Sequence, residues 1–423
     1  MIKKICLFVG LCLFTFYAKS QDFHTYFENK SLRINYVHSG NKEADNIELS
    51  FFQQNDIWAG STVSLLDPND YGCHKIMVFD SLTNILIYSH TYSCLFGEYR
   101  TTEQGKKITK SFKETVLCPF PKNTVRIEFY TRTQKSDFEK KYEIIVNPNL
   151  ITIVSNTYHC QPFDLYIGGA VHHAYDLVIV PEGYSIKDSA KLRIDMERCK
   201  NAIINCSPFK ESANIINIRT VIAYSDESGI SQETKGKIVN TVLGSSFYSL
   251  DLERYLMLDD VWKLHDVCAN VPYDNILIMC NTTKYGGGGI YNWYATVSDN
   301  THLNYVCVHE LGHAIGGLAD EYYTSEVSVQ DFYPVGKEPW EPNITSLVHF
   351  ESKWKFMLDK KTPIPTPSTD ENKSKLGVYE GAGYCAKGLY RPYISCTMKD
   401  IVYDKFCPVC KSKILEMLQL YAR

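Results

Sequence analysis

The chain has 423 residues, too many for one ordinary domain, and its length indicates two or three domains. Hydrophobic residues make up 44% and charged residues 22%, proportions typical of a globular protein with buried cores. The formal net charge of −4 is small and gives no support for nucleic acid or an anionic membrane as partner, since either would require a basic patch.

The first twenty residues have the composition of a secretory signal peptide. Two lysines follow the start, an apolar run covers 5–16, and Ala18-Lys-Ser20 supplies small residues before the expected cleavage site. We expect cleavage after Ser20 and an exported protein, whether periplasmic, cell-surface or secreted. A lipid anchor on Cys12 is less favoured, because Leu11 stands where a small residue is needed. No later apolar run has transmembrane length, so no spanning helix is expected in the mature chain.

Short strand candidates separated by turn signals occupy residues 21–150. They lie at 32–37, 46–54, 75–79, 85–88, 115–117 and 125–130. This spacing predicts an antiparallel β-sandwich. The stretch contains no dense cluster of His, Asp and Glu, and we interpret it as an accessory binding or packing domain.

The pattern changes near residues 147–162, and residues 160–423 are expected to form an α/β catalytic domain. Strands are predicted at 175–180, 216–222 and 274–280, and the first is mostly apolar, as expected of a strand buried on both faces. Residues 185–205 have helical spacing, with a buried side predicted at Ile186, Ala190, Ile194 and Cys199. Residues 359–375 indicate a long exposed loop. The predicted fold class is therefore α+β.

Fifteen cysteines are present, and Cys6 and Cys12 would leave with the signal peptide, so thirteen remain. Export permits disulfides, but an odd number leaves at least one free thiol. Cys407 and Cys410 form the only close pair, and without a second pair they make a poor structural zinc site. A local disulfide and two buried thiols are both consistent with them.

The most informative segment is 304–316, in which apolar residues surround His309, Glu310 and His313. Two histidines four residues apart project from one face of a helix and can bind one Zn²⁺. Glu310 can act as general base on a water activated by the metal. The apolar flanks predict a buried helix, where these polar groups would be costly without a metal or other partners. A solvent-facing helix with incidental histidines, the alternative, conflicts with those flanks.

Acidic residues follow the end of this helix, which Gly316 and Gly317 are suited to form. Asp320 is the favoured third metal ligand, and Glu321 is the runner-up. A further alternative is that Asp320 only orients a ligand histidine.

Residues 309–322 resemble the active-site segment of the IgA-peptidase family of bacterial zinc metallopeptidases, which is metzincin-like. Further stretches that fit this family lie at 57–61, 114–116, 176–184, 285–289, 379–384, 388–392 and 395–398. The resemblance covers essentially all of 165–423 and is weaker in the N-terminal part. It implies a zinc peptidase fold with a methionine turn beneath the metal. The chain departs from metzincins at Ala319, where they carry a third histidine ligand.

Met398 fits the methionine turn that the resemblance implies, and it precedes a predicted closing helix at 404–420. Some metzincins stabilise the oxyanion with a tyrosine two residues after this methionine, but here that residue is Asp400. Tyr384 and Tyr390 are the candidates for the oxyanion or substrate role, and stabilisation by the metal alone is the other alternative.

Tyr285 is followed by four glycines at 286–289. No Lys-Ser or Lys-Thr comes after them, so we reject a phosphate-binding loop. A flexible cleft rim where substrate pairs with an edge strand and a plain turn are both consistent with this segment.

The expected function is that of an exported zinc-dependent endopeptidase with Zn²⁺ as cofactor. A protein or peptide is the expected substrate, with host glycoproteins and immunoglobulin among the candidates, and the sequence indicates no oligomeric state. Two rivals stay open. One is an exported binding or adhesion protein on a peptidase-like scaffold with little or no turnover, against which the intact Glu310 argues. The other is a zinc hydrolase that acts on a glycoconjugate.

Overall fold

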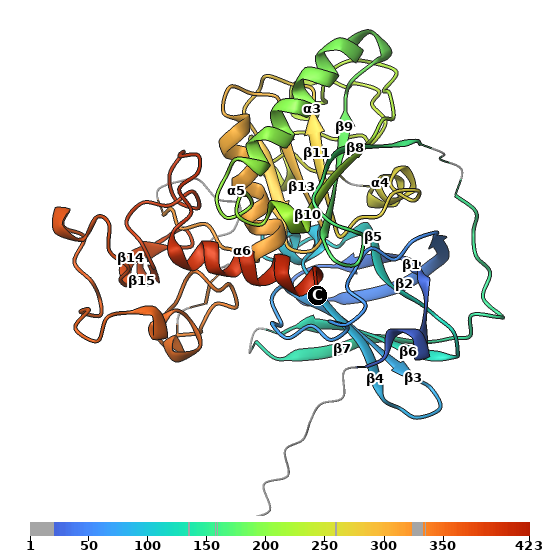
Figure 1. The fold of residues 1–423 in the computed structure, drawn as a ribbon, viewed down its shortest axis with the longest axis horizontal. Coiled ribbons are helices and arrows are strands. Elements are labelled where there is room, and N and C mark those ends of the chain that lie inside the picture. The colour runs from blue at the N-terminus through green and yellow to red at the C-terminus, as the bar shows by residue number, and fades with distance from the viewer. Residues whose placement is uncertain are drawn as a thin grey trace, which may run out of the picture.

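Seven antiparallel strands from the N-terminal part of the chain form two neighbouring sheets (Figure 1). The computed structural model describes residues 21–423 except 134, 135, 157, 159, 259, 324–332 and 335, so the predicted signal peptide at 1–20 lies outside the described residues. One sheet has the order β2-β1-β5 and the other β4-β3-β6-β7. The elements are α1 (Phe23–Tyr26), β1 (Phe27–Gly40), β2 (Asp45–Asn55), β3 (His74–Asp80), β4 (Leu86–Tyr92), α2 (Leu95–Tyr99), β5 (Lys110–Pro121), β6 (Val125–Arg132) and β7 (Phe138–Val146).

The two sheets share one apolar core, to which β3, for example, contributes every second residue. Tyr36 on β1 packs against Phe129 on β6 with ring centroids 5.4 Å apart, so the contact joins one sheet to the other. The predicted antiparallel β architecture of this part is confirmed. The predicted elements did not include β7 or the two short helices.

A six-stranded mixed sheet forms the centre of the second part of the chain, with the order β12-β13-β11-β9-β10-β8. Its four central strands are parallel, and β8 and β12 pair antiparallel at the two edges. The elements are β8 (Pro162–Ile167), β9 (Tyr175–Glu182), α3 (Ser189–Ile204), β10 (Ile216–Val221), α4 (Val261–Val267), β11 (Asn275–Cys280), β12 (Gly287–Ile290), β13 (Tyr294–Ser298), α5 (Leu303–Gly316), β14 (Tyr379–Ala382), β15 (Cys385–Arg391) and α6 (Pro408–Tyr421). The predicted α/β character is confirmed, although α6 begins four residues later than expected.

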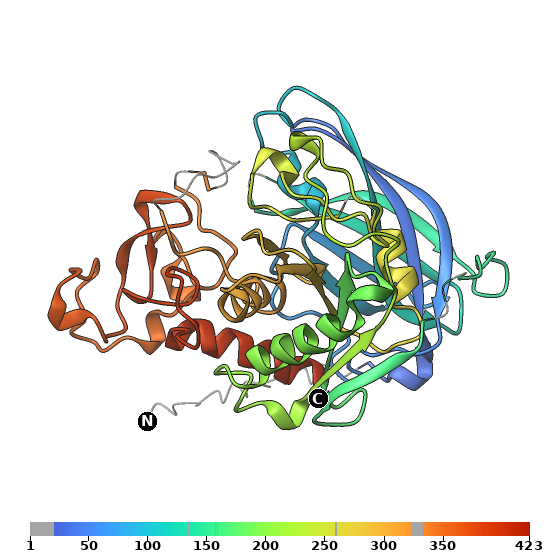
Figure 2. The ribbon, with the colours of Figure 1, turned by 90° about the horizontal axis from the view of Figure 1, so that it is seen from above.

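Helices cover one face of this sheet and the N-terminal sheets lie on its other side (Figure 2). Leu177 and Ile179 on β9 pack in the core that contains α3, α5 and α6, whereas Val178 and Val180 pack in the core shared with the N-terminal strands. Both faces of β9 are therefore buried. This explains why its sequence is a mostly apolar run.

The predicted buried side of the helix at 185–205 was wrong except at Cys199. Ile186 and Ile194 are 64% and 68% exposed, and Ala190 is also exposed. Ile186 belongs to a separate 3-10 turn before α3, so a helical period counted from it is out of phase. The buried side of α3 instead repeats at Leu192, Asp195, Met196, Cys199, Ala202 and Ile203.

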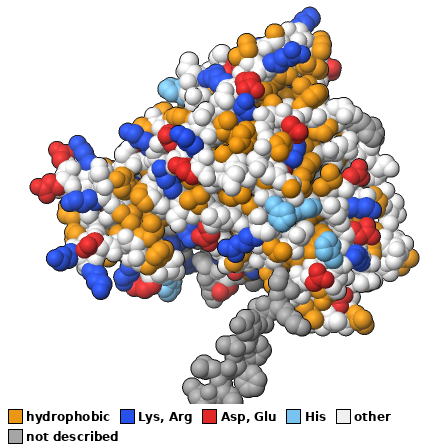
Figure 3. Space-filling model, viewed as in Figure 1, with side chains coloured by type: hydrophobic (Ala, Val, Ile, Leu, Met, Phe, Trp, Pro, Cys, Tyr) orange, Lys and Arg blue, Asp and Glu red, His pale blue; other side chains and the backbone are white. Residues whose placement is uncertain are grey.

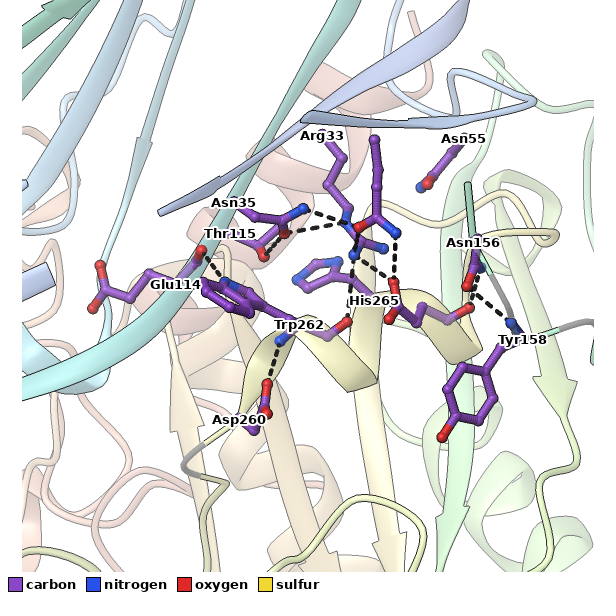
Figure 4. Close-up of polar contacts among 12 residues, drawn as sticks. Arg33, Asn35, Asn55, Glu114, Thr115, Asn156, Tyr158, Asp260, Trp262 and His265 are labelled. Carbon is purple, nitrogen blue, oxygen red and sulfur yellow. Dashed lines mark hydrogen bonds and ion pairs between the residues drawn. The ribbon is translucent and has the colours of Figure 1, made fainter. Parts of the chain in front are cut away.

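Helix α4 joins the two parts of the chain, because it lies against strands of the N-terminal three-stranded sheet (Figure 4). The Arg33 guanidinium is 0% exposed and contacts the Asp266 carboxylate at 2.5 Å. Gln53 Nε2 donates to the same carboxylate at 3.1 Å, and Trp262 Nε1 donates to the Glu114 carbonyl at 2.8 Å. This side-chain network ties the N-terminal domain to the central sheet.

The segment between α5 and α6 forms a separate lobe around the β14–β15 hairpin (Figure 1). Residues 359–375 run over its surface with most side chains exposed, as expected. On the face drawn in Figure 3, acidic and basic side chains are interspersed. Among the described residues, none of the helices combines the length and apolar character needed to cross a bilayer.

Candidate active site

Helix α5 carries His309, Glu310 and His313 and lies against strands β12 and β13. Close approach to β12 requires a glycine, because a Cβ at Gly289 would lie 2.3 Å from the Glu310 carbonyl oxygen. The helix ends at Gly317, whose φ of 59° is in the left-handed region. One ligand atom each of His309, Glu310 and His313 lie within 4.8 Å of one another. The spacing in sequence therefore places these three groups together, as predicted.

Asp320 completes a triangle of donor atoms with the two histidines. His309 Nε2 and His313 Nε2 are 3.3 Å apart, and Asp320 Oδ1 lies 3.1 Å from the first and 3.4 Å from the second. Oδ1 is buried and makes no hydrogen bond of acceptable geometry with any described residue, although it is this close to both nitrogens. The three atoms thus lie close together around a common point.

The other ring nitrogen of each histidine faces a backbone carbonyl. His309 Nδ1 is 2.9 Å from Thr397 O, and His313 Nδ1 is 2.5 Å from Leu318 O. A carbonyl can only accept, so each Nδ1 carries its proton and donates. In its neutral form, each imidazole therefore presents an unprotonated Nε2 to the triangle, which is the state that binds a metal.

The charge of the triangle is shared among its members. Burial lowers the pKa of His313, but the Asp320 carboxylate outweighs this and raises it to about 9. Burial raises the pKa of Asp320, but the two imidazoles hold it well below its ordinary value. Electrostatically, the site favours a cation next to the Asp320 carboxylate.

Backbone contacts hold Asp320 in position, while its neighbour Glu321 turns away. Asn343 is fully buried; its amide accepts from Ala319 N at 2.7 Å and donates to Ala319 O at 2.9 Å. Glu321 N donates to Met398 O at 2.8 Å, and its carboxylate accepts from Asn343 Nδ2 at 3.0 Å. Of the two acids weighed as third ligand, Asp320 is the one beside the imidazoles.

Met398 lies beneath α5, at the position that the methionine turn was expected to occupy. It is fully buried, and its sulfur would be 2.7 Å from a Cβ placed on Gly312, between the two histidines. The preceding carbonyl, Thr397 O, is the acceptor of His309 Nδ1. This turn therefore packs against the helix and orients one imidazole.

Tyr384 reaches the site and Tyr390 does not. The Tyr384 hydroxyl donates to Asp320 Oδ2 at 2.5 Å, and its backbone N–H donates to Tyr322 O at 2.9 Å. Tyr390 lies on β15, where its backbone pairs with Thr345, and it is not among the described residues that line the site cavity. Tyr384 thus contacts an acid of the triangle directly.

A cavity of about 400 Å³ lies beside the triangle, lined by His309, Glu310, His313, Asp320, Tyr322 and Tyr384 among others. Burial raises the pKa of the Glu310 carboxyl, and the two neighbouring imidazoles partly offset this. A carboxyl at such a position can exchange a proton with a bound reactant. The volume is in the range of ligand-binding clefts.

The N-terminal domain also lines this cavity, which the sequence analysis did not predict. Its contributions are Gly72, Cys73, Ser93, Gly97, Glu98 and Thr101. Burial raises the pKa of Glu98 to about 7, and its carboxylate accepts from the Tyr255 hydroxyl at 2.6 Å. Arg254, from the catalytic part of the chain, also lines the cavity, and its guanidinium donates to the Tyr322 hydroxyl at 3.0 Å. No local pattern marks these residues, since only folding brings them to α5.

The glycine segment after Tyr285 is neither a plain turn nor a freely available edge. Gly287–Ile290 form β12, the edge strand next to the cavity. Its outer side is already paired at Gly287, whose N–H donates to Arg254 O and whose carbonyl accepts from Leu256 N. A substrate strand would therefore have to bind beyond this pairing.

Comparison with known families covers most of the chain. The family described as IgA Peptidase M64 matches residues 164–375 and 368–418, and the Peptidase M64 N-terminus matches residues 22–143. No curated protein matches the chain. The first match spans α5, the donor triangle and the Met398 turn, and the second spans the two N-terminal sheets. The chain therefore belongs to the IgA peptidase M64 family, a family of metallopeptidases.

Proposed function

We propose that this peptidase is an exported, zinc-dependent endopeptidase whose metal is held by His309, His313 and Asp320. The convergence of the two Nε2 atoms and Asp320 Oδ1 is the observation that carries the proposal. Zinc bonds of about 2.0–2.1 Å place tetrahedral ligand atoms roughly 3.3 Å apart. The three separations of 3.1, 3.3 and 3.4 Å match that value.

Three protein ligands are typical of catalytic zinc sites, which keep a fourth position open, whereas structural sites have four. When bound, zinc would act as a Lewis acid toward water and the scissile carbonyl. Tyr384 would keep Asp320 in its ligating orientation through the hydrogen bond to Oδ2. Thr397 O and Leu318 O would fix the ring orientation of the two histidines.

Glu310 would carry the proton in the reaction. Its carboxylate lies beside the imidazoles on the cavity side, so it can take a proton from the attacking water and return it to the leaving amine. Burial, which raises its pKa, favours a carboxylate that accepts a proton readily near neutral pH. Arg254 supplies a positive charge to the cavity lining, suited to polar groups of a bound peptide.

Two substitutions separate these roles. Glu310→Gln should retain the metal content of the wild type and lose nearly all turnover, because only the proton carrier is removed. Asp320→Ala should lose one metal per chain as well as turnover, because a ligand is missing. Metal analysis after dialysis against a weak chelator, together with a casein-cleavage assay, measures both. Unchanged metal content in Asp320→Ala would refute the ligand set.

The substrate class and the rivals can be tested with the same preparations. Cleavage of casein or immunoglobulin that stops on chelation and returns with zinc supports an endopeptidase. Binding of either protein without cleavage would favour the binding or adhesion function instead. Release of sugar without peptide cleavage from a glycoprotein would favour a glycoconjugate hydrolase.

Export is proposed from the sequence of residues 1–20. The mature protein should begin at Gln21, and N-terminal sequencing of the exported form measures this. A mature chain that retains residues 1–20, or lipid on Cys12, would contradict the proposal.

A further inference from the structure

Four side chains that can bind metal meet behind the active site, and none of them belongs to the donor triangle. They are Glu321, Cys396, Cys407 and Cys410. One ligand atom of each lies within 4.8 Å of the other three, and all four residues are buried, with exposures of 0–2%. They come from the segment after α5, the turn that contains Met398, and the start of α6. Only the tertiary structure brings them together.

The separations between these side chains are close to those of a metal-bound set. Cys396 Sγ and Cys410 Sγ are 3.8 Å apart, and tetrahedral Zn–S bonds of about 2.3 Å place two sulfurs roughly 3.8 Å apart. Cys410 Sγ lies 3.2 Å from Glu321 Oε1, a separation that has to open by a few tenths of an ångström on metal binding. Three thiolates and a carboxylate are ligands that select zinc over calcium or magnesium.

The Glu321 carboxylate points independently to a bound cation. It is 0% exposed, and Oε2 is buried without a hydrogen-bond partner among the described residues. Among the described residues, Glu321 also forms no ion pair. A buried carboxylate with an orphan oxygen is costly unless a proton or a cation satisfies it. Its position next to three sulfurs makes a metal cation a fitting partner.

Backbone N–H groups already point at two of the sulfurs. Cys407 N donates to Cys396 Sγ at 3.2 Å, and Cys410 N donates to Cys407 Sγ at 3.5 Å. Cys407 is the N-cap of the 14-residue helix α6. Donors of this kind and the positive end of a helix stabilise thiolates, which are the metal-binding form of cysteine.

Another group of three buried side chains, His38, His74 and Cys94, is a weaker candidate for a metal site. Both ring nitrogens of His38 are already engaged, by Asp45 at 2.7 Å and Glu114 at 2.8 Å. His38 therefore has no nitrogen available for a metal. The cluster around Glu321 is the stronger candidate.

We propose that Glu321, Cys396, Cys407 and Cys410 bind a structural zinc ion, distinct from the one in the active site. The four ligands leave no open position, so this ion would support the fold rather than the reaction. It would tie α6 and the Met398 turn to the segment of Asp320, since Glu321 is the next residue and its N–H donates to Met398 O. The second ion would thus hold the floor and the acidic ligand of the active site in register.

Metal counting on the mature protein tests this site. The wild type should contain two zinc ions per chain, Cys407→Ser and Glu321→Gln one each, and His313→Ala one. Cys118→Ser, which changes another fully buried thiol far from the cluster, should retain both. Cobalt substitution of the wild type should give the near-ultraviolet charge-transfer absorption of a cobalt thiolate, which persists in His313→Ala and disappears in Cys407→Ser.

Specific outcomes would overturn the proposal. A wild type without thiolate–cobalt absorption does so even if the cysteine variants fail to fold, as does full metal content in Cys407→Ser. A Cys396–Cys410 disulfide is the main competing structure, and thiol titration of the unreduced, unfolded protein would then find two thiols fewer than the thirteen free ones of the structure. If His313→Ala keeps the wild-type metal content while Cys407→Ser loses metal, the active-site proposal fails and this one stands.

Discussion

Replacement of Tyr384 by phenylalanine probes how the acidic corner of the active site is held. The Tyr384 hydroxyl donates to Asp320 Oδ2 at 2.5 Å, and Tyr384→Phe removes this donor while keeping the ring. A hydrogen bond to a charged group is worth about 1.5–3 kcal/mol, or a roughly 10–150-fold change in an equilibrium constant. The range overlaps the ~10–100-fold loss of metal affinity typical for a partner of a metal ligand.

The assay measures the zinc affinity of the active site by competition with a chelator of known affinity. The active-site ion is identified as the one that is lost in His313→Ala. Tyr384→Phe should weaken this ion about 10–100-fold, and Tyr390→Phe, on the same hairpin but outside the cavity lining, should not. Unchanged affinity in Tyr384→Phe would refute the reasoning. If kcat falls while affinity is retained, Tyr384 acts on the substrate or oxyanion instead.

Three further predictions concern stability and packing. Burial lowers the pKa of His38, but its two carboxylate partners outweigh this and raise it to about 9. Relative to an unfolded pKa of about 6.5, this shift contributes on the order of 3 kcal/mol to the free energy of unfolding; the contribution is complete below pH 6.5 and is lost as the pH rises through 9. Urea unfolding of the wild type should therefore become easier over this pH interval, and that of His38→Gln less so. Asp266→Ala leaves the buried Arg33 guanidinium without its carboxylate, so it should destabilise the protein by about 3 kcal/mol in chemical denaturation. Equal stability of variant and wild type would contradict the proposed importance of the contact between α4 and the N-terminal sheet. Gly289→Ala would place a Cβ 2.3 Å from the Glu310 carbonyl oxygen; it should lower the Tm, at a cost of about 1–3 kcal/mol or more, and reduce kcat.

Local sequence patterns predicted the parts of the fold that depend on neighbouring residues. Strand-forming runs between turn signals identified β1 and β3, and the mostly apolar run of β9 identified a strand with both faces covered. The buried side of α3 was predicted wrongly, because a 3-10 turn at Ile186–Asp188 shifts the phase of the helix and periodicity alone does not reveal it.

The sequence by itself determined that His309 and His313 share one helical face, because four residues nearly complete a helical turn, and that Glu310 lies beside the first of them. It also narrowed the expected third metal ligand to two adjacent acidic residues, Asp320 and Glu321. Only the tertiary structure placed Asp320 beside the imidazoles and turned Glu321 toward the cysteines, because backbone contacts with distant residues, not local propensity, set the direction of each side chain. The same holds for Glu98 in the cavity wall and for Cys396 beside Cys407 and Cys410. Long-range packing of separate segments creates both the cavity wall and the cysteine cluster, and no spacing along the chain encodes either of them.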